Sequence, residues 1–186
     1  MLWLGDNWYT REVDYSSEWG LWYRASRDRS HEILQPFLKA MPHYAIWDDH
    51  DFGWNDAGKY YPYKEQSKEI FLSFFKEPAE SERRKHEGIY HAEYIQQGDK
   101  TVQLILLDVR TFRNSLLLYD TTAKLPRKNY FYTPDYQPHI SKDSLLLGEA
   151  QWKWLEEELK KPADLRLICS GSQFSIEYNG YEAWAN

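Results

Sequence analysis

The residues best suited to chemistry are three carboxylates and one imidazole in the consecutive positions Asp48, Asp49, His50 and Asp51. They directly follow the apolar residues 44–47, an order that predicts a buried strand opening into a loop, where α/β sheets bind their ligands. Crowded carboxylates in a partly dry site cannot all stay ionised without a cation, so a bound metal ion is the simplest compensation. A solvated turn whose aspartates cap a helix is the open alternative.

A second apolar run, residues 2–4, also ends in an acidic residue, Asp6. Gly5 stands just before it and allows backbone and ligand to approach closely. If both runs are parallel strands of one sheet, Asp6 and Asp49 emerge at the same edge. They can then share one cation or a pair of cations.

Composition limits the classes of protein to which these residues can belong. A chain of 186 residues with 42% hydrophobic residues suits one folded domain and excludes disorder. A net charge of −6 argues against a surface that binds nucleic acid or an anionic membrane. Cys169 is the single cysteine, so no internal disulfide is possible, and no apolar run reaches the roughly 18 residues of a membrane span.

Helical periodicity is expected in four segments, which must support the two strand ends. Trp19, Trp22 and Tyr23 form an aromatic stripe that is expected to lie in the core. The four segments are residues 18–25, 33–41, 64–75 and 147–161.

After the acidic cluster, residues 89–95 and 101–109 are expected to form a β-hairpin, and its apolar second arm is expected to be a central strand. Residues 165–169 are expected to form a short buried strand. The charged residues 80–87 are expected to form a solvated loop, and residues 115–142 a long ordered loop.

Arg110 follows the central strand and is expected to clamp a phosphate group, since a guanidinium matches two phosphate oxygens at once. The alternative interpretation pairs Arg110 or Arg113 with Asp108 to brace the loop.

Four motifs together resemble the alkaline phosphatase D (PhoD-like) branch of the calcineurin-like metallophosphoesterases: residues 5–9, 47–51, 107–113 and 147–155. The resemblance implies an α/β fold, an α/β/β/α sandwich with two mixed sheets, incomplete at both ends. Residues 1–186 would then be a partial PhoD-like metallophosphatase domain. It also implies two metal ions and hydrolysis of phosphomonoesters or phosphodiesters by a metal-bound hydroxide.

Residue by residue, the resemblance implies that Asp6 bridges two metals, that Tyr9 binds a ferric ion, and that Asp49 stands where most of the superfamily has a bridging Asn. A phenolate is a hard donor that suits Fe(III), and a carboxylate at position 49 suits Ca²⁺ or another divalent cation. His50 matches the histidine that contacts the substrate phosphate and protonates the leaving group, with Asp51 expected to orient it.

Two expected features of the superfamily are not found in these 186 residues: a ligand on a strand before Gly5, and a His-containing segment after the last strand. The chain is therefore expected to be a fragment. The expected partner is a phosphoester substrate, and an extracytoplasmic location follows from the resemblance alone. The competing interpretation is a non-catalytic or degenerate domain that binds metal or glycans.

Overall fold

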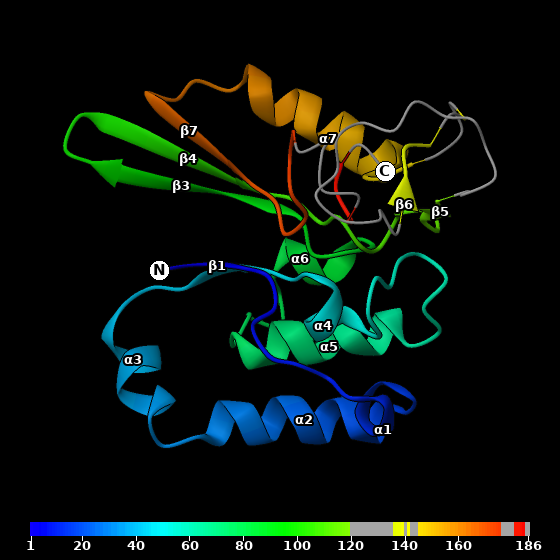
Figure 1. Cartoon of the computed structure of the whole chain (residues 1–186). Coiled ribbons are helices and arrows are strands. Elements are labelled where there is room, and N and C mark those ends of the chain that lie inside the picture. The colour runs from blue at the N-terminus through cyan, green and yellow to red at the C-terminus, as the bar shows by residue number, and fades with distance from the viewer. Residues whose placement is uncertain (120–135, 140, 142–144, 176–180, 185–186) are drawn as a thin grey trace.

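Two β-sheets lie face to face between helices in the computed structural model, which describes residues 1–119, 136–139, 141, 145–175 and 181–184 (Figure 1). In the first sheet, β1 (Leu2–Leu4) is parallel to β2 (Tyr44–Ile46). In the second, β4 (Lys100–Leu106) lies between antiparallel β3 (His91–Gln97) and parallel β7 (Leu165–Cys169). Figure 1 shows α7 on one face of this mixed sheet and the first sheet with α5 on the other. The predicted α/β sandwich with mixed sheets is confirmed.

The remaining elements are short or lie outside the sheets. β5 (Leu117–Leu118) and β6 (Tyr136–Gln137) form a small antiparallel pair. The helices are α1 (Glu12–Tyr15), α2 (Glu18–Ser30), α3 (Leu34–Ala40), α4 (Asp49–Phe52), α5 (Lys64–Phe74), α6 (Glu82–Lys85) and α7 (Gly148–Lys160). The structure confirms the predicted hairpin, its central second arm, and the helices at 64–75 and 147–161. Most of the expected long loop, residues 115–142, lies outside the described residues.

The main core fills the space between the two sheets and α5. Ile46 from β2, Leu104 and Leu106 from β4, and Phe71 from α5 belong to one buried cluster. Burying one such side chain contributes about 1.5–3 kcal/mol. This packing fixes the C-terminal end of β2, from which Asp49 emerges.

The aromatic stripe on α2 faces solvent, so the prediction that it lies in the core was wrong. Trp19 is 73% exposed, and Trp22 and Tyr23 are also exposed. The buried face carries Arg24, whose Nη2 lies 2.9 Å from Oδ2 of the buried Asp14 on α1. The same face buries Gly20, Leu21 and Ala25, and Leu21 and Ala25 belong to the main core.

The charged residues 80–87 contain a helix, α6, and one of its arginines is buried, contrary to the expectation of a solvated loop. Arg83 donates to the carbonyl oxygens of Ala45 and Ile89, each at 3.1 Å, and to Glu77 Oε2 at 3.0 Å. Arg83 therefore connects β2 to the residues just before β3.

β7 is an exposed edge strand and not the buried strand that was predicted. Leu165 and Ile168 are more than half exposed, and among the described strands β7 pairs with β4 alone. A continuous apolar run is compatible with either position, which is why the prediction failed. No helix within the described ranges is long and apolar enough to span a membrane.

Candidate metal centre

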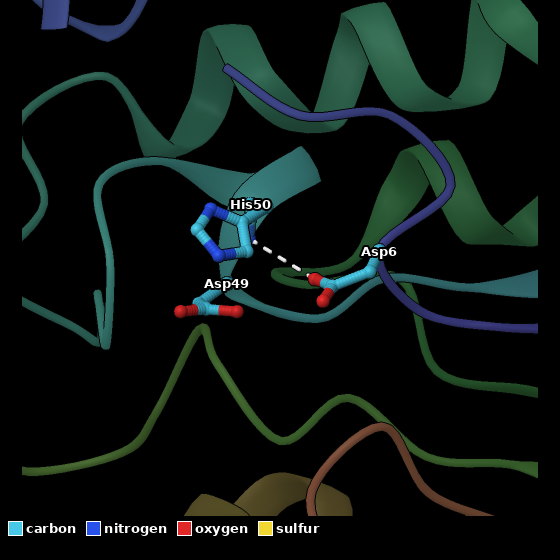
Figure 2. Close-up of side chains that lie close together, drawn as sticks. All are labelled: Asp6, Asp49 and His50. Carbon is cyan, nitrogen blue, oxygen red and sulfur yellow. Dashed lines mark hydrogen bonds between the residues drawn. The ribbon is translucent and has the colours of Figure 1, made fainter. Parts of the chain in front are cut away.

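The ends of β1 and β2 bring Asp6 and Asp49 together, as their position after two parallel strands predicted. Leu2 is opposite Tyr44 and Leu4 is opposite Ile46, so both strands end at the same edge. One ligand atom from each of Asp6, Asp49 and His50 lies within 4.8 Å of the others. Figure 2 shows these side chains grouped where β2 runs into α4. Carboxylate oxygens and imidazole nitrogens at this spacing can hold one cation.

Backbone geometry at Gly5 makes this approach possible. Gly5 has φ +106°, and a Cβ atom there would lie 2.5 Å from Cβ of Asp48. Asp6 itself has φ +52°, in the sparsely populated left-handed region. A non-glycine residue held there costs free energy, and such strain is concentrated at functional sites.

Asp49 remains a competent anionic ligand although it is buried. Burial is the largest influence and raises its pKa, but the charge of Arg110 and a hydrogen bond from the Asp56 amide, 2.7 Å from Oδ2, together lower the pKa below its usual value. Ionised carboxylates bind hard cations, so the surroundings favour the metal-binding form.

Asp51 fixes the backbone of the site, which differs from its expected role of orienting His50. Its Oδ1 accepts from the Asp48 amide at 2.7 Å, and its Oδ2 accepts from the Asn7 amide at 3.1 Å and from the Asn7 side chain. Asp48 and Asp51 form a capping box on α4, so the helix-cap interpretation holds for these two aspartates. Burial raises the pKa of Asp51 well above its usual range.

Tyr9 lies beside the predicted ligands. Its hydroxyl donates to Asp6 Oδ2 at 2.9 Å, and its ring centroid is 4.3 Å from that of His50. This hydrogen bond and the negative charge of Asp6 raise the pKa of Tyr9. Only a nearby cation would reverse that effect and make a tyrosinate stable.

Arg110 is fully buried and bound by protein carboxylates, a geometry that differs from the expected phosphate clamp. Nε donates to Asp48 Oδ1 at 2.7 Å, and Nη1 and Nη2 donate to the two oxygens of Glu182 at 2.5 and 2.7 Å. Burial lowers the pKa of Arg110, but Glu182 and Asp48 outweigh burial and raise it. Arg110 therefore holds Asp48, the neighbour of Asp49, in place.

Asp108 braces the loop through three backbone amides and two side chains, and not through the Arg110 or Arg113 guanidinium. Its Oδ1 accepts from Trp47 Nε1 and from the amides of Arg110 and Thr111, each at 2.9 Å. Its Oδ2 accepts from the Ile89 amide at 2.9 Å and from the Thr111 hydroxyl at 2.7 Å. This buried carboxylate therefore connects the ends of β2 and β4 to the segment entering β3.

Glu182 is the residue that sequence reasoning missed. Ligand atoms of Asp49, Asp56 and Glu182 also lie within 4.8 Å of one another, and the three side chains line a cavity of about 400 Å³. Burial raises the pKa of Glu182 to about 7, against the opposing effect of Arg110 and Arg113. A lone glutamate 72 residues beyond Arg110, in a segment with no periodic pattern, gives no signal of this role.

Comparison with known proteins shows which proteins the chain resembles over most of its length. The family model described as PhoD-like phosphatase matches residues 6–179. A solved structure titled "Structure of PhoD" superposes with a TM-score of 0.63 at 16% sequence identity, covering 93% of this chain and 35% of that one. At this identity the likeness shows the fold, and the chain spans about a third of the length of the solved protein. No curated protein matches the sequence.

Proposed function

The chain belongs to the PhoD-like phosphatase family, and from this premise we propose that residues 1–186 are a partial metallophosphatase domain that hydrolyses phosphoesters with bound metal ions. One observation carries the proposal: the carboxylates of Asp6 and Asp49 converge at the ends of two parallel strands, with the His50 imidazole beside them. Family membership supports the reaction class, and the site's geometry supports the metal dependence.

The charges around the site fit the binding of cations. Two guanidinium groups, Arg110 and Arg113, face a larger number of carboxyl groups, an excess that bound cations would balance. The carboxyl groups belong to Asp6, Asp48, Asp49, Asp51, Asp56 and Glu182. Asp6, Tyr9 and Asp49 would hold the metals, with Fe(III) near the phenol and Ca²⁺ or another divalent cation near the carboxylates.

The chain's own residues then divide into contacting and positioning groups. Bound cations supply Lewis-acid activation of the attacking water and neutralise charge that develops on the phosphoryl oxygens. His50, beside Asp6 and Tyr9, would donate a proton to the departing oxygen. Asp51 is a positioning residue because it holds the backbone of the site, and Nε of Arg110 holds Asp48.

The substrate is proposed to be a phosphomonoester or phosphodiester. Family resemblance also supports an extracytoplasmic location. Both proposals concern the whole protein.

Replacing Asp6 by Asn tests the function directly. With Fe(III) and Ca²⁺ present, we expect D6N to lose at least a hundredfold of the hydrolysis of p-nitrophenyl phosphate or bis-p-nitrophenyl phosphate. D99N, on the exposed hairpin turn, is the matched control and should retain wild-type activity. Activity of D6N within tenfold of wild type contradicts the proposal.

Metal binding gives a readout that does not require turnover. A tyrosinate on Fe(III) absorbs visible light, so wild-type protein loaded with iron should be coloured and Y9F should lose the band. A coloured wild-type protein without turnover would identify a degenerate metal-binding domain.

Exposed aromatic residues favour a second candidate, a glycan-binding domain. The rings of Trp19 and Tyr23 stack with centroids 5.2 Å apart and form a flat, solvent-facing surface on α2. Oligosaccharides that quench tryptophan fluorescence in the wild type but not in W19A would support this function.

A further inference from the structure

A carboxylate from the C-terminal segment occupies two buried guanidinium groups beside the metal centre. Glu182 accepts from Nη1 and Nη2 of Arg110 and forms an ion pair with Nη1 of Arg113. Arg110 is completely buried and Arg113 is only 3% exposed. A guanidinium that donates hydrogen bonds to both oxygens of one carboxylate can donate to two oxygens of a phosphate group in the same geometry.

The position of this pair suits a ligand that also reaches the metals. Glu182 lines the same cavity as Asp49 and Ser172, and its side chain is 13% exposed. Nη2 of Arg110 lies 4.0 Å from Asp49 Oδ1 and donates to Ser172 Oγ at 3.3 Å. An oxyanion in the place of the Glu182 carboxylate would therefore lie next to a proposed metal ligand.

We propose that Arg110 and Arg113 form an oxyanion subsite for the phosphate group, and that Glu182 fills this subsite as an internal competitor. The inference rests on the proposed function, because without bound cations Asp48 and Asp49 would repel a phosphate dianion. Arg110 then has two states: bound to Glu182 when the cavity is empty, and bound to phosphate when it is filled.

Two hydrogen bonds from Trp184 anchor the segment that carries Glu182. The amide of Trp184 donates to Gln173 O at 3.0 Å, and the Trp184 indole donates to Ser170 Oγ at 2.8 Å. Rotation of the Glu182 side chain into the cavity therefore needs no unfolding of this segment. Arg113 Nε is buried and has no hydrogen-bond partner within the described ranges, so its guanidinium has an unused donor.

Titration with inorganic phosphate tests the subsite. Isothermal titration calorimetry compares wild type with E182A, each with and without saturating Ca²⁺. We expect E182A to bind phosphate at least tenfold more tightly than wild type in the Ca²⁺ condition, and the double variant E182A/R113M to lose that gain. E149A removes an exposed glutamate from the start of α7 and should bind phosphate as wild type does.

The result that overturns the subsite is a gain below tenfold in the Ca²⁺ condition, or a gain that survives R113M. If circular dichroism shows that E182A does not fold, E182Q replaces it, because glutamine keeps the shape of the side chain. E182Q should then bind phosphate at least threefold more tightly than wild type, and a smaller gain overturns the subsite. Ca²⁺ binding without the tenfold phosphate gain contradicts the subsite alone, whereas absence of Ca²⁺ binding in every variant contradicts the proposed function on which the subsite rests.

Discussion

Replacing Asp108 by Asn should destabilise the fold through one buried carboxylate. Asp108 is fully buried, and its two oxygens accept five hydrogen bonds from four residues. The four donor residues are Trp47, Ile89, Arg110 and Thr111. Asparagine keeps the shape of the side chain but exchanges one acceptor oxygen for a donor.

The expected loss follows from the geometry of the two oxygens. The side-chain nitrogen of the new asparagine in D108N destabilises the fold least if it takes the place of Oδ2. The buried Ile89 amide then has no acceptor, which costs about 2 kcal/mol of stability. The three bonds to Oδ1 lose their charge assistance, at about 1 kcal/mol each. Burying an amide costs less than burying a carboxylate, which offsets part of this loss and leaves about 3 kcal/mol. That is a large share of the roughly 5–15 kcal/mol that stabilises a typical domain.

Urea denaturation followed by tryptophan fluorescence measures this change. With a denaturant slope of about 2 kcal/mol per molar, the midpoint of D108N should fall by about 1.5 M. D99N makes the same substitution on the exposed hairpin turn and should change stability by less than about 0.5 kcal/mol. A loss below about 1 kcal/mol in D108N would refute the argument that these five bonds hold the loop.

Three further substitutions have expected outcomes. Burial raises the pKa of Asp14, but hydrogen bonds from Arg11 and Arg24 outweigh burial and lower it. The ionised Asp14 therefore stabilises the fold above the pKa that it has in the unfolded chain, and this stabilisation is lost as the pH falls through its lower pKa in the folded protein. D14N should therefore cost about 3 kcal/mol at pH 7 and make the unfolding free energy flatter below pH 4 in urea titrations. G171A would place a Cβ 2.7 Å from the Trp47 carbonyl oxygen and should lower stability by about 1–3 kcal/mol, seen as a lower melting temperature. F71A removes a fully buried ring and should cost about 3–5 kcal/mol by urea denaturation, where a loss below about 1 kcal/mol would be unexpected.

The convergence of Asp6 and Asp49 was predictable from local pattern. Each residue follows a short apolar run, and parallel strands of one sheet end at the same edge. Gly5 was expected to allow backbone and ligand to approach closely, and the structure shows instead that its backbone lies against Asp48. These signals lie within a few residues of the groups that they position.

The parts that were not predicted depend on contacts between distant residues. Spacing placed Trp19, Trp22 and Tyr23 on one face of a helix, but α2 buries the face that carries Leu21 and Arg24, the latter paired with Asp14 of α1. Arg110 looked available to substrate until Glu182, 72 residues away, was seen to occupy it. Asp14, the partner of Arg24, and Glu182, the partner of Arg110, do not belong to a periodic pattern. The residues near Arg24 and Arg110 in the sequence therefore could not reveal these two contacts.

The open edge of β7 has a consequence for handling this chain in solution. No strand in the described part of the chain pairs with the outer edge of β7, so this edge and the exposed Leu165, Leu167 and Ile168 form a template on which a second molecule can add a strand. A net charge of −6 keeps molecules apart at low ionic strength, but salt screens that repulsion and leaves the apolar attraction intact. Aggregation through β7 should therefore increase, not decrease, as salt is added.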